Sequence, residues 1–320
     1  MTLTVCASAI ALSIFTQATL AREKRLTEVV KDKLEAGEMF LFNGAVHDAI
    51  AEFKTVISID KSNWQAHADL AQALTKIQDV YGAEEEYREA VRLSPADVNL
   101  LSTLATLLYK DQKFAEAAEV FEKISGPAGE RDDLKLMLAS CYLNSDKLEK
   151  SKALYLQLHQ HSPQNVDFIL GLAATYFKLG DREQAVKRID QAIKDGIADS
   201  RLVQLKGEMF ENNGNKLAAK ESYELAIKAN ANNPEAFVSL GNLNLTEGNF
   251  NESSVNFDKA LQLQPENKDA LLGLAYSQEH LGNLKEAVAN FKKAASLESD
   301  DKKRETIFKH LAEIQFAKFK

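Results

Sequence analysis

The chain has 320 residues, of which 45% are hydrophobic and 27% are charged, a composition that folds in water and excludes an intrinsically disordered protein. With only 14 Gly and 5 Pro, an all-β fold with many tight turns is disfavoured and collagen-like structure is excluded. Lys and Arg number 39 against 47 Asp and Glu, giving a net charge of −8. Because phosphates and anionic lipids repel an acidic chain, we expect no nucleic-acid partner and no lipid surface as the primary partner.

Residues 1–21 contain no charged side chain and have the layout of a secretory signal peptide. An apolar run from Val5 to Phe15 is followed by small residues ending at Ala21, and the first charge is Arg22. No Lys or Arg precedes the apolar run. We expect an exported protein, periplasmic or secreted. The alternatives are an uncleaved membrane anchor formed by residues 3–21 and an apolar leader without a targeting role.

Three columns of residues recur every 34 positions in the rest of the chain. The first column runs from Ala49 to Ala287 and contains only Ala or Ser, and a second column, twelve residues earlier, contains only Gly or Ala. A third column, four residues after the first, is aromatic in seven of eight cases. A fixed period of this length indicates a stacked array of structural repeats. The eight predicted repeats start at residues 30, 64, 98, 132, 166, 200, 234 and 268.

Each repeat is predicted to form two helices. In the seventh repeat, Phe237 and Asn244 share one face of a first helix, Gly248 marks a turn, and Phe257 lies on the buried stripe of a second helix. Small residues allow the two helices to approach closely, and the aromatic side chain is expected to fill the space between them. In the third repeat, the run from Gly126 to Gly129 is expected to end the second helix early and to loosen the joint.

This pattern resembles the tetratricopeptide repeat family, whose 34-residue unit carries a large residue, Leu-Gly, Tyr, Ala, Phe and Pro at fixed spacings. In the seventh repeat the matching residues are Phe237, Leu240, Gly241, Ser253, Phe257, Ala260 and Pro265, with Asn244 in place of the Tyr. The resemblance implies an all-α fold in which residues 22–301 form a right-handed superhelical solenoid of antiparallel helix pairs. It also implies a scaffold or adaptor that binds a peptide or helix of a partner protein in a concave groove.

Residues 302–320 do not continue the repeat. Ile307, Leu311 and Ile314 fall on one helical face, and six basic residues against two acidic ones give this tail a charge of +4, which leaves −12 for the rest of the chain. We expect a C-terminal capping helix that covers the last repeat. The alternative is a basic amphipathic segment that contacts a membrane or a partner.

The sequence carries no phosphate-binding loop, no His-Glu-x-x-His motif and no Cys-x-x-Cys motif. His159 and His161 lack a third ligand, so we expect solvated turn residues there rather than a metal site. Cys141 falls at a core position and is expected to be a buried thiol. The acidic run from Glu84 to Glu86 is expected to be a solvated helix start. We therefore predict no catalytic residue, no metal, no cofactor and no enzymatic activity of the chain itself.

The binding surface is predicted on the first helices, on the face opposite the core. At 100° per residue, positions 2, 5, 9, 12 and 13 of each repeat point away from the core positions 4, 7, 8 and 11, and in the family this opposite face lines the groove. Repeats 3 to 5 present a largely apolar strip there. The predicted groove residues are Tyr109, Lys110, Leu136, Ser140, Leu143, Leu170, Ala174, Phe177 and Lys178.

Two alternatives accompany this interpretation. If the strip packs between neighbouring first helices, the binding surface is expected in the acidic C-terminal half, among Glu208, Glu211, Asn242 and Glu279. The function would then still be protein binding. A different function is an accessory or regulatory subunit of an enzyme, or of a secretion or polysaccharide assembly complex. In either case the partner is a protein or peptide, and a membrane is contacted only through an uncleaved N-terminal segment.

The leader generates a prediction about the mature protein. If residues 1–21 are a cleaved signal peptide, the mature chain begins near Arg22. N-terminal sequencing and intact-mass measurement of the protein from its native source check this. A soluble cytoplasmic protein that retains Met1 or Thr2 would contradict it.

Overall fold

The computed structural model describes residue 22 and residues 24–124 and 131–317, with side chains as far as residue 314. The predicted signal peptide at residues 1–21 lies outside the described residues. Within the described ranges the chain forms helices and no strand, and no helix there is long and apolar enough to cross a bilayer. The predicted all-α fold is confirmed.

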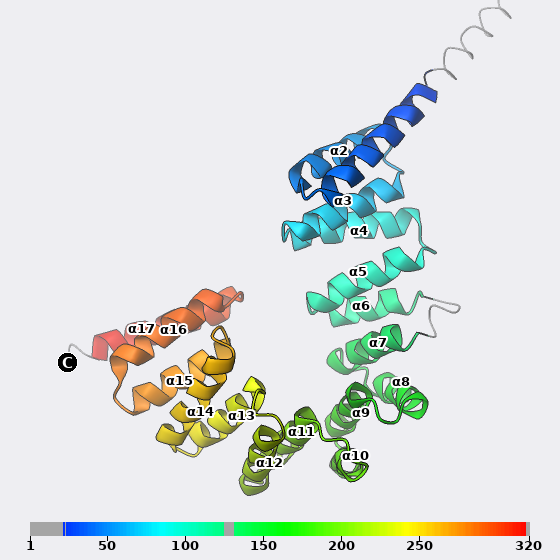
Figure 1. Cartoon of the computed structure of the whole chain (residues 1–320). Helices are drawn as coiled ribbons and strands as arrows, with labels where there is room; N and C mark the ends of the chain where they lie inside the picture. Colours follow the sequence, from blue (N-terminus) through cyan, green and yellow to red (C-terminus); the bar gives the residue numbers. More distant parts are fainter. Residues whose placement is uncertain (1–21, 23, 125–130, 318–320) are drawn as a thin grey trace, which may run out of the picture. The chain divides into compact units, whose positions relative to one another are not determined.

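The chain divides into two compact units, one ending at Lys147 and the other beginning at Leu148. In the first unit, a helical segment at residues 24–42 precedes α2 (Val46–Ile59), α3 (Trp64–Lys76), α4 (Val80–Leu93), α5 (Val98–Lys110), α6 (Phe114–Phe121) and α7 (Asp132–Asn144) (Figure 1). The second unit contains α8 (Leu148–His161), α9 (Val166–Lys178), α10 (Arg182–Lys194), α11 (Ser200–Asn212), α12 (Lys216–Ala229), α13 (Pro234–Thr246), α14 (Phe250–Leu263), α15 (Lys268–His280), α16 (Leu284–Leu297) and α17 (Asp301–Ala317). Within each unit, antiparallel helix pairs stack in sequence order, which is the predicted solenoid architecture.

The turn inside each helix pair needs one residue in the left-handed region. Glycine supplies it after α13, where Gly248 has φ +78°, and at the equivalent position of four other pairs. In the first unit, Gln78, Gln112 and Asp146 occupy this position with φ between 56° and 63°. The positive φ angle therefore recurs every 34 residues, even in the turns that have no glycine.

The core of each pair is an aromatic ring of the second helix set against small residues of the first. Phe53, Tyr223, Phe257 and Phe291 are fully buried. A Cβ added at Gly241 would lie 2.9 Å from the Phe257 ring, and one added at Gly273 of the next pair would lie 2.1 Å from it. The Phe257 ring thus fills the space between α13 and α15, as the columns of small and aromatic residues predict.

The serines in the alanine column are also buried, and their hydroxyls are satisfied. Ser253 donates to the carbonyl of Gly241 at 2.9 Å and shares a hydrogen bond with Ser277 at 2.9 Å. Ser151 shares one with Thr175 at 3.1 Å. A hydroxyl is therefore tolerated here because a partner lies on the facing first helix.

The tail forms α17, which packs on α16. Ile307, Leu311 and Ile314 are buried in one cluster with Phe291 and neighbouring alanines of the last helix pair. Since this apolar face is occupied inside the chain, α17 acts as the predicted cap, and Phe308 projects outward with 52% of its surface exposed.

The second helix of the third repeat, α6, does end early at Phe121, while residues 125–130 lie outside the described part of the chain.

The expectation of a solvated acidic helix start was wrong for Glu84, which is 9% exposed. Its carboxylate accepts hydrogen bonds from Arg88 at 2.8 Å and from Lys113 of the next repeat at 2.7 Å. Paired with two cations, this carboxylate can be buried.

The packing of Phe257 yields a stability prediction. Gly→Ala inside a helix ordinarily stabilises by about 1 kcal/mol. Gly273→Ala should instead destabilise by about 1–3 kcal/mol, because the new methyl group overlaps the Phe257 ring. Urea unfolding followed by circular dichroism measures the change.

The matched control is a double-mutant cycle with Phe257→Leu. Removing the ring creates room for the methyl group. Gly273→Ala should therefore lower the free energy of unfolding much less in the Phe257→Leu background than in the wild type. Additive effects would show that the ring contact does not set the distance between these helices.

Candidate functional site

The residues of the fourth repeat that could carry chemistry lie on α7 and α8. Cys141 is fully buried, as predicted, and burial raises the pKa of its thiol to about 12. Among the described residues, no group of three or more His, Cys, Asp or Glu side chains is placed to hold a metal ion.

The expectation of solvated turn residues was wrong for His159. It lies within α8, is half-buried, and its Nδ1 atom is buried without a hydrogen-bond partner. Burial, and then the charge of Arg188, lower the pKa of its imidazole. His159 is therefore a half-buried side chain of α8, close enough to feel the charge of Arg188 on α10, rather than a solvated turn residue.

First helices pack side by side in the second unit. The helix α9 contacts α11, α11 contacts α13 and α13 contacts α15, whereas the described second helices α10, α12 and α14 make no comparable contact with one another. The first helices therefore lie on the inner side of this stack. Positions 2, 5 and 9 of the repeat are on these helices.

The predicted groove residues of the first unit lie on α5 and α7, which contact each other. The hydroxyl groups of Tyr109 and Ser140 share a hydrogen bond of 3.0 Å between the two helices. The rings of Tyr109 and Phe114 also pack in a T-shaped arrangement, with ring centroids 5.5 Å apart. Leu136 and Leu143 are half-buried, and Lys110 is exposed. This half of the strip is partly engaged in packing between first helices.

The predicted groove residues of the second unit lie on α9. Leu170 and Phe177 are half-buried and pack against the core cluster that contains Ile169 and Met209. Ala174 is half-buried and Lys178 is exposed. The structure thus places the nine predicted residues in two separate units, and each half combines inter-helix packing with a remaining accessible face. Their role in binding stays a prediction.

A cavity of about 360 Å³ opens beside the predicted strip in the first unit. Its walls come from α3, α4, α5, α7 and the residue before α7. Of the predicted groove residues only Lys110 lines it, together with Ser102 and Thr106 at groove positions 5 and 9. Five of its eleven lining residues carry a hydroxyl group, and the others are apolar or charged, so this cavity combines polar and apolar side chains.

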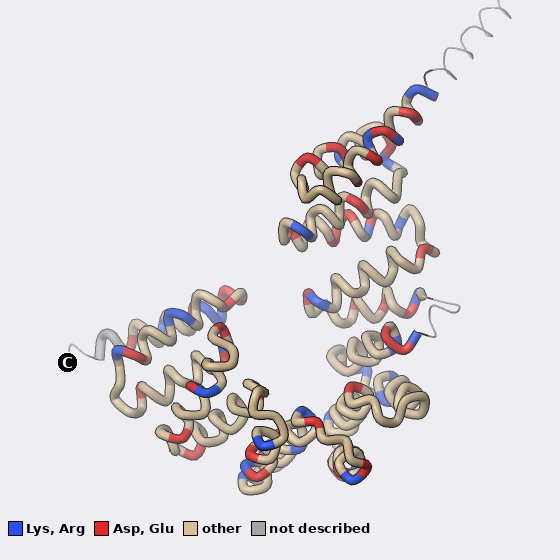
Figure 2. The backbone as a smooth tube through the Cα atoms, in the orientation of Figure 1, with Lys and Arg blue, Asp and Glu red and all other residues tan. Residues whose placement is uncertain are grey.

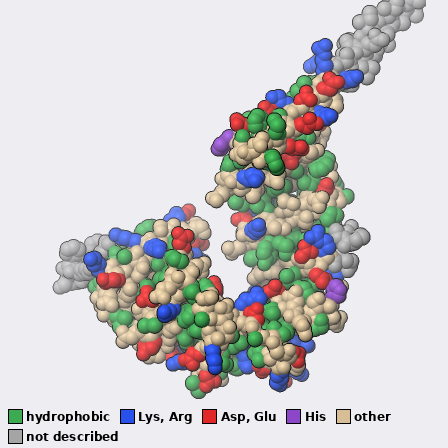
Figure 3. Space-filling view, in the orientation of Figure 1, with side chains coloured by type: hydrophobic (Ala, Val, Ile, Leu, Met, Phe, Trp, Pro, Cys, Tyr) green, Lys and Arg blue, Asp and Glu red, His purple; other side chains and the backbone are tan. Residues whose placement is uncertain are grey.

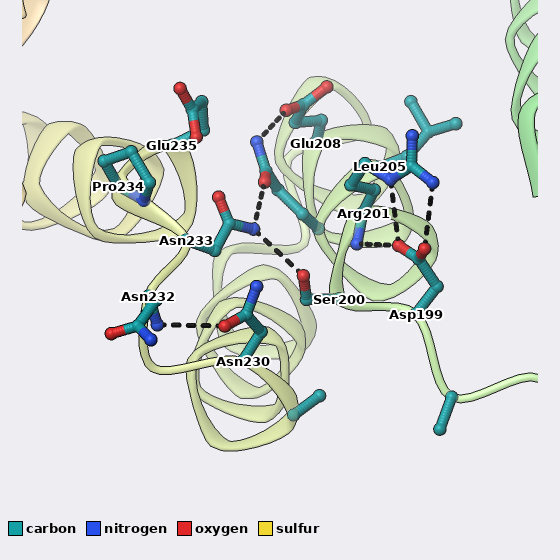
Figure 4. Close-up of a pocket in the computed structure, with 13 residues that line it drawn as sticks. Asp199, Ser200, Arg201, Leu205, Glu208, Asn230, Asn232, Asn233, Pro234 and Glu235 are labelled. Atoms are coloured by element: carbon teal, nitrogen blue, oxygen red, sulfur yellow. Dashed lines mark hydrogen bonds and ion pairs between the residues drawn. The ribbon is translucent and has the colours of Figure 1, made fainter. Parts of the chain in front are cut away.

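A second cavity, of about 650 Å³, lies between α11 and the start of α13 in the second unit (Figure 4). Arg201, Gln204 and Glu208, at groove positions 2, 5 and 9 of the sixth repeat, form one wall. Asn233 and Glu235 form the opposite wall. The groove columns therefore point to this cavity, which begins one repeat beyond the end of the predicted strip.

A chain of hydrogen bonds crosses this cavity. The amide of Asn233 donates to the Ser200 hydroxyl at 3.2 Å and to the Gln204 oxygen at 3.1 Å, and the Gln204 amide donates to Glu208 at 3.1 Å. Asn233 precedes α13, where the equivalent residues of other pairs, such as Asn63 before α3, cap their own helix through the side chain. Asn233 makes no such cap and turns toward α11 instead.

The charged residues around this cavity differ in whether they have an ion-pair partner. Arg201 bonds both oxygens of Asp199, at 3.1 and 2.9 Å, and also Asp167 at 2.8 Å. Glu208 has no ion pair within the described part of the chain. Burial raises the pKa of its carboxyl, and the neighbouring Glu211 raises it further. The cavity wall therefore carries a desolvated carboxylate without a counter-charge.

Of the alternative acidic positions, only Glu208 lines this cavity. Glu211 accepts a hydrogen bond from the Tyr223 hydroxyl at 2.7 Å, Glu279 pairs with His310 of α17 at 2.8 Å, and Asn242 is exposed. Sequence reasoning missed Asn233 because it read only first-helix positions. Its place as the last residue of a repeat, followed by Pro234, was the available signal.

Charged residues of both signs occur along each unit (Figure 2). Hydrophobic side chains remain visible among them in the space-filling view (Figure 3). Exposed apolar residues also occur on second helices, for example Leu217 and Leu225 on α12. Scattered exposed apolar residues are normal on soluble proteins, so apolar exposure alone does not mark the binding face.

Comparison with known families gives one consistent result. Models described as tetratricopeptide repeat match residues 34–98, 152–209, 200–233 and 244–304. Together these ranges cover more than half of the chain.

Curated relatives are distant and mostly longer. Human protein O-mannosyl-transferase TMTC1 is 23% identical over 168 residues, which are 50% of this chain and 19% of that protein. The general transcriptional corepressor ssn6 of Schizosaccharomyces pombe is 24% identical over 43% of this chain and 12% of its own length. Human DnaJ homolog subfamily C member 3 is 23% identical over 67% of this chain and 39% of its own length. The chain spans less than two fifths of each of these relatives.

Solved structures share the fold. Yeast Tom70 superposes with a TM-score of 0.68 at 16% identity, covering 90% of this chain and 64% of Tom70. A tetratricopeptide repeat protein from Parabacteroides merdae gives a TM-score of 0.61 at 13% identity, covering 78% of this chain and 99% of that one. At such low identities the likeness concerns the fold alone.

A half-buried acid in the first unit, Asp69, provides a pH-dependent prediction. Burial, and then the charge of Glu38, raise the pKa of Asp69 from 3.8 to about 6, and its Oδ2 atom is buried without a partner. The folded chain thus holds this proton more tightly than the unfolded chain does. Stability from this group is present below pH 3.8 and is lost as the pH rises through 6.

Asp69→Asn should therefore raise the free energy of unfolding at pH 7 by about 1–2 kcal/mol, a figure reduced from the full shift because the side chain is partly solvated. At pH 3.5 the gain should vanish. Urea unfolding at both pH values measures it, with the exposed Asp32→Asn as control. An equal effect of Asp69→Asn at both pH values would refute the assignment.

Proposed function

Because this chain belongs to the tetratricopeptide repeat family, we propose that it is a non-enzymatic scaffold that binds a peptide or helix of a partner protein along the inner face of its first helices. One observation carries the proposal: the α11–α13 cavity is lined by groove positions 2, 5 and 9, whose side chains the core of the helix pairs does not use. Side chains free of core packing are available to a ligand.

The proposed ligand contacts differ along the array. In the first unit, the predicted strip of Tyr109, Leu136 and Leu143 offers apolar surface beside a cavity that is lined in part by hydroxyl groups. In the second unit, α9 offers Leu170 and Phe177, and α11 offers polar side chains. An amphipathic or extended segment with apolar and polar residues suits such a surface.

A second candidate function is an accessory subunit that brings an enzyme to its substrate. The resemblance to TMTC1 favours it, because that protein is named as a transferase and the matched region forms only 19% of it. A repeat array in that protein therefore accompanies a much longer chain. Co-purification of this chain with a stoichiometric enzyme would favour the accessory role.

Export of the protein is a further part of the proposal and is supported by the sequence of residues 1–21 alone. A periplasmic or secreted scaffold would meet partners of the cell envelope or of the exterior. A leader that stays uncleaved would instead hold the scaffold at a membrane through residues 3–21.

The groove proposal is tested with one substitution in each half of the predicted strip. Leu143→Asp combined with Phe177→Asp should reduce partner recovery in affinity purification from source cells by at least about tenfold, if these residues are binding hot spots. Quantitative mass spectrometry of the recovered proteins measures the loss. Circular dichroism must show that the variant stays folded.

Two controls make the result interpretable. Leu225→Asp changes a side chain that is 55% exposed on the second helix α12, and it should leave recovery unchanged. Leu172→Asp changes a fully buried residue and should unfold its repeat. If the variant with Leu143→Asp and Phe177→Asp loses as much stability as Leu172→Asp, these residues serve packing, and the proposed strip is wrong.

A further inference from the structure

The walls of the α11–α13 cavity present hydrogen-bond acceptors. Both N–H groups of the Asn233 amide are used by Ser200 and Gln204, which leaves its oxygen without a partner among the described residues. Asn233 is only 7% exposed, and Figure 4 shows its oxygen pointing away from those two bonds, to the side where Glu208 and Glu235 lie. An acceptor whose amide group is held in place by two hydrogen bonds is preorganised for a donor.

The two glutamates add negative charge to the same cavity. Glu208 has one oxygen bonded to Gln204 and no cation partner in the described chain, and Glu235 is exposed at the start of α13 without a cation partner there. The cation that lines the cavity, Arg201, is already engaged by Asp199 and Asp167. The cavity therefore has an excess of acceptors and of negative charge.

We propose that this cavity binds the cationic side chain of a lysine or arginine on the partner segment, which rests on the groove binding proposed above. An ammonium group has three donors and a guanidinium group five, and neither has an acceptor, so both complement a wall of acceptors. Hydrogen bonds to ionised carboxylates are shorter and stronger than those between neutral groups.

Other ligand classes fit the cavity less well. An acidic side chain would be repelled by Glu208 and Glu235 and would leave the Asn233 oxygen unpaired. An apolar side chain would cover a half-buried carboxylate without replacing its water, which is unfavourable. At about 650 Å³ the cavity has ample room for a long side chain and part of its backbone.

The inference is tested with short blocked peptides of one central residue, acetyl-Gly-X-Gly-amide, where X is lysine, arginine, norleucine or glutamate. Norleucine has nearly the shape of lysine without the ammonium group. Titration into the full chain is followed by the ¹⁵N NMR signals of the Asn233 side-chain amide and of residues 199–208. The lysine and arginine peptides should shift these signals, and the norleucine and glutamate peptides should not.

Glu208→Gln should weaken binding of the lysine peptide by about tenfold, because it removes the charge and keeps the shape. The matched control, Glu221→Gln, removes an exposed charge on α12 and should leave binding unchanged. Equal binding of the norleucine peptide, or unchanged binding to Glu208→Gln, would overturn the inference.

The same variants separate this inference from the proposed function. If Glu208→Gln keeps full partner recovery and the lysine peptide does not bind, the cavity inference fails while groove binding stands. If the strip variant and Glu208→Gln both keep full recovery, the groove proposal itself fails. Lysine-peptide binding that Glu208→Gln weakens supports the cavity inference in either case.

Discussion

The structure depends on the contact between an aromatic ring and the small residues that face it. Phe257 fills the space between Gly241 and Gly273, so this ring determines how closely α13 and α15 approach. The same arrangement pairs Tyr223 with Gly207 and Phe53 with Gly37. Because second-helix rings occupy the core, first helices lie beside one another, and their opposite faces are left for other contacts.

In a core filled by aromatic rings, a polar side chain is tolerated only where a partner satisfies it. Glu84 is buried because Arg88 and Lys113 supply charges on both sides of it. Ser253 is buried because Ser277 and a backbone carbonyl satisfy its hydroxyl. Glu208 differs from these, since a neutral amide is its hydrogen-bond partner in the described chain. A half-buried acid without a counter-charge is costly unless a ligand completes it.

The family shares the backbone arrangement, while ligand choice lies with residues that the core does not use. Tom70 and the Parabacteroides merdae protein superpose on this chain at 16% and 13% identity. Such low identity suffices for the fold because only the small and aromatic columns need to persist. The inner-face positions differ from repeat to repeat, from hydroxyls on α5 to an amide and a carboxylate on α11. Under the proposed groove binding, each stretch of the array would contact a partner segment of different chemistry.

The sequence by itself determined the period, the helix pairs, the small and aromatic core columns, the buried thiol of Cys141 and the cap formed by α17. These features follow from it because every repeat contacts mainly its neighbours, so a periodic pattern has one way to bury its apolar faces. Only the tertiary structure decided that Glu84 is buried, that His159 is packed, and that the Asn233 amide turns toward α11 instead of capping its own helix. The Glu84 side chain meets Lys113 of the next repeat, 29 residues away. The Asn233 side chain meets Ser200 and Gln204 of α11, 33 and 29 residues away. Helical periodicity predicts which face of a helix a side chain occupies. The rotamer and the hydrogen-bond partner of that side chain depend on the neighbouring helix that packs against it.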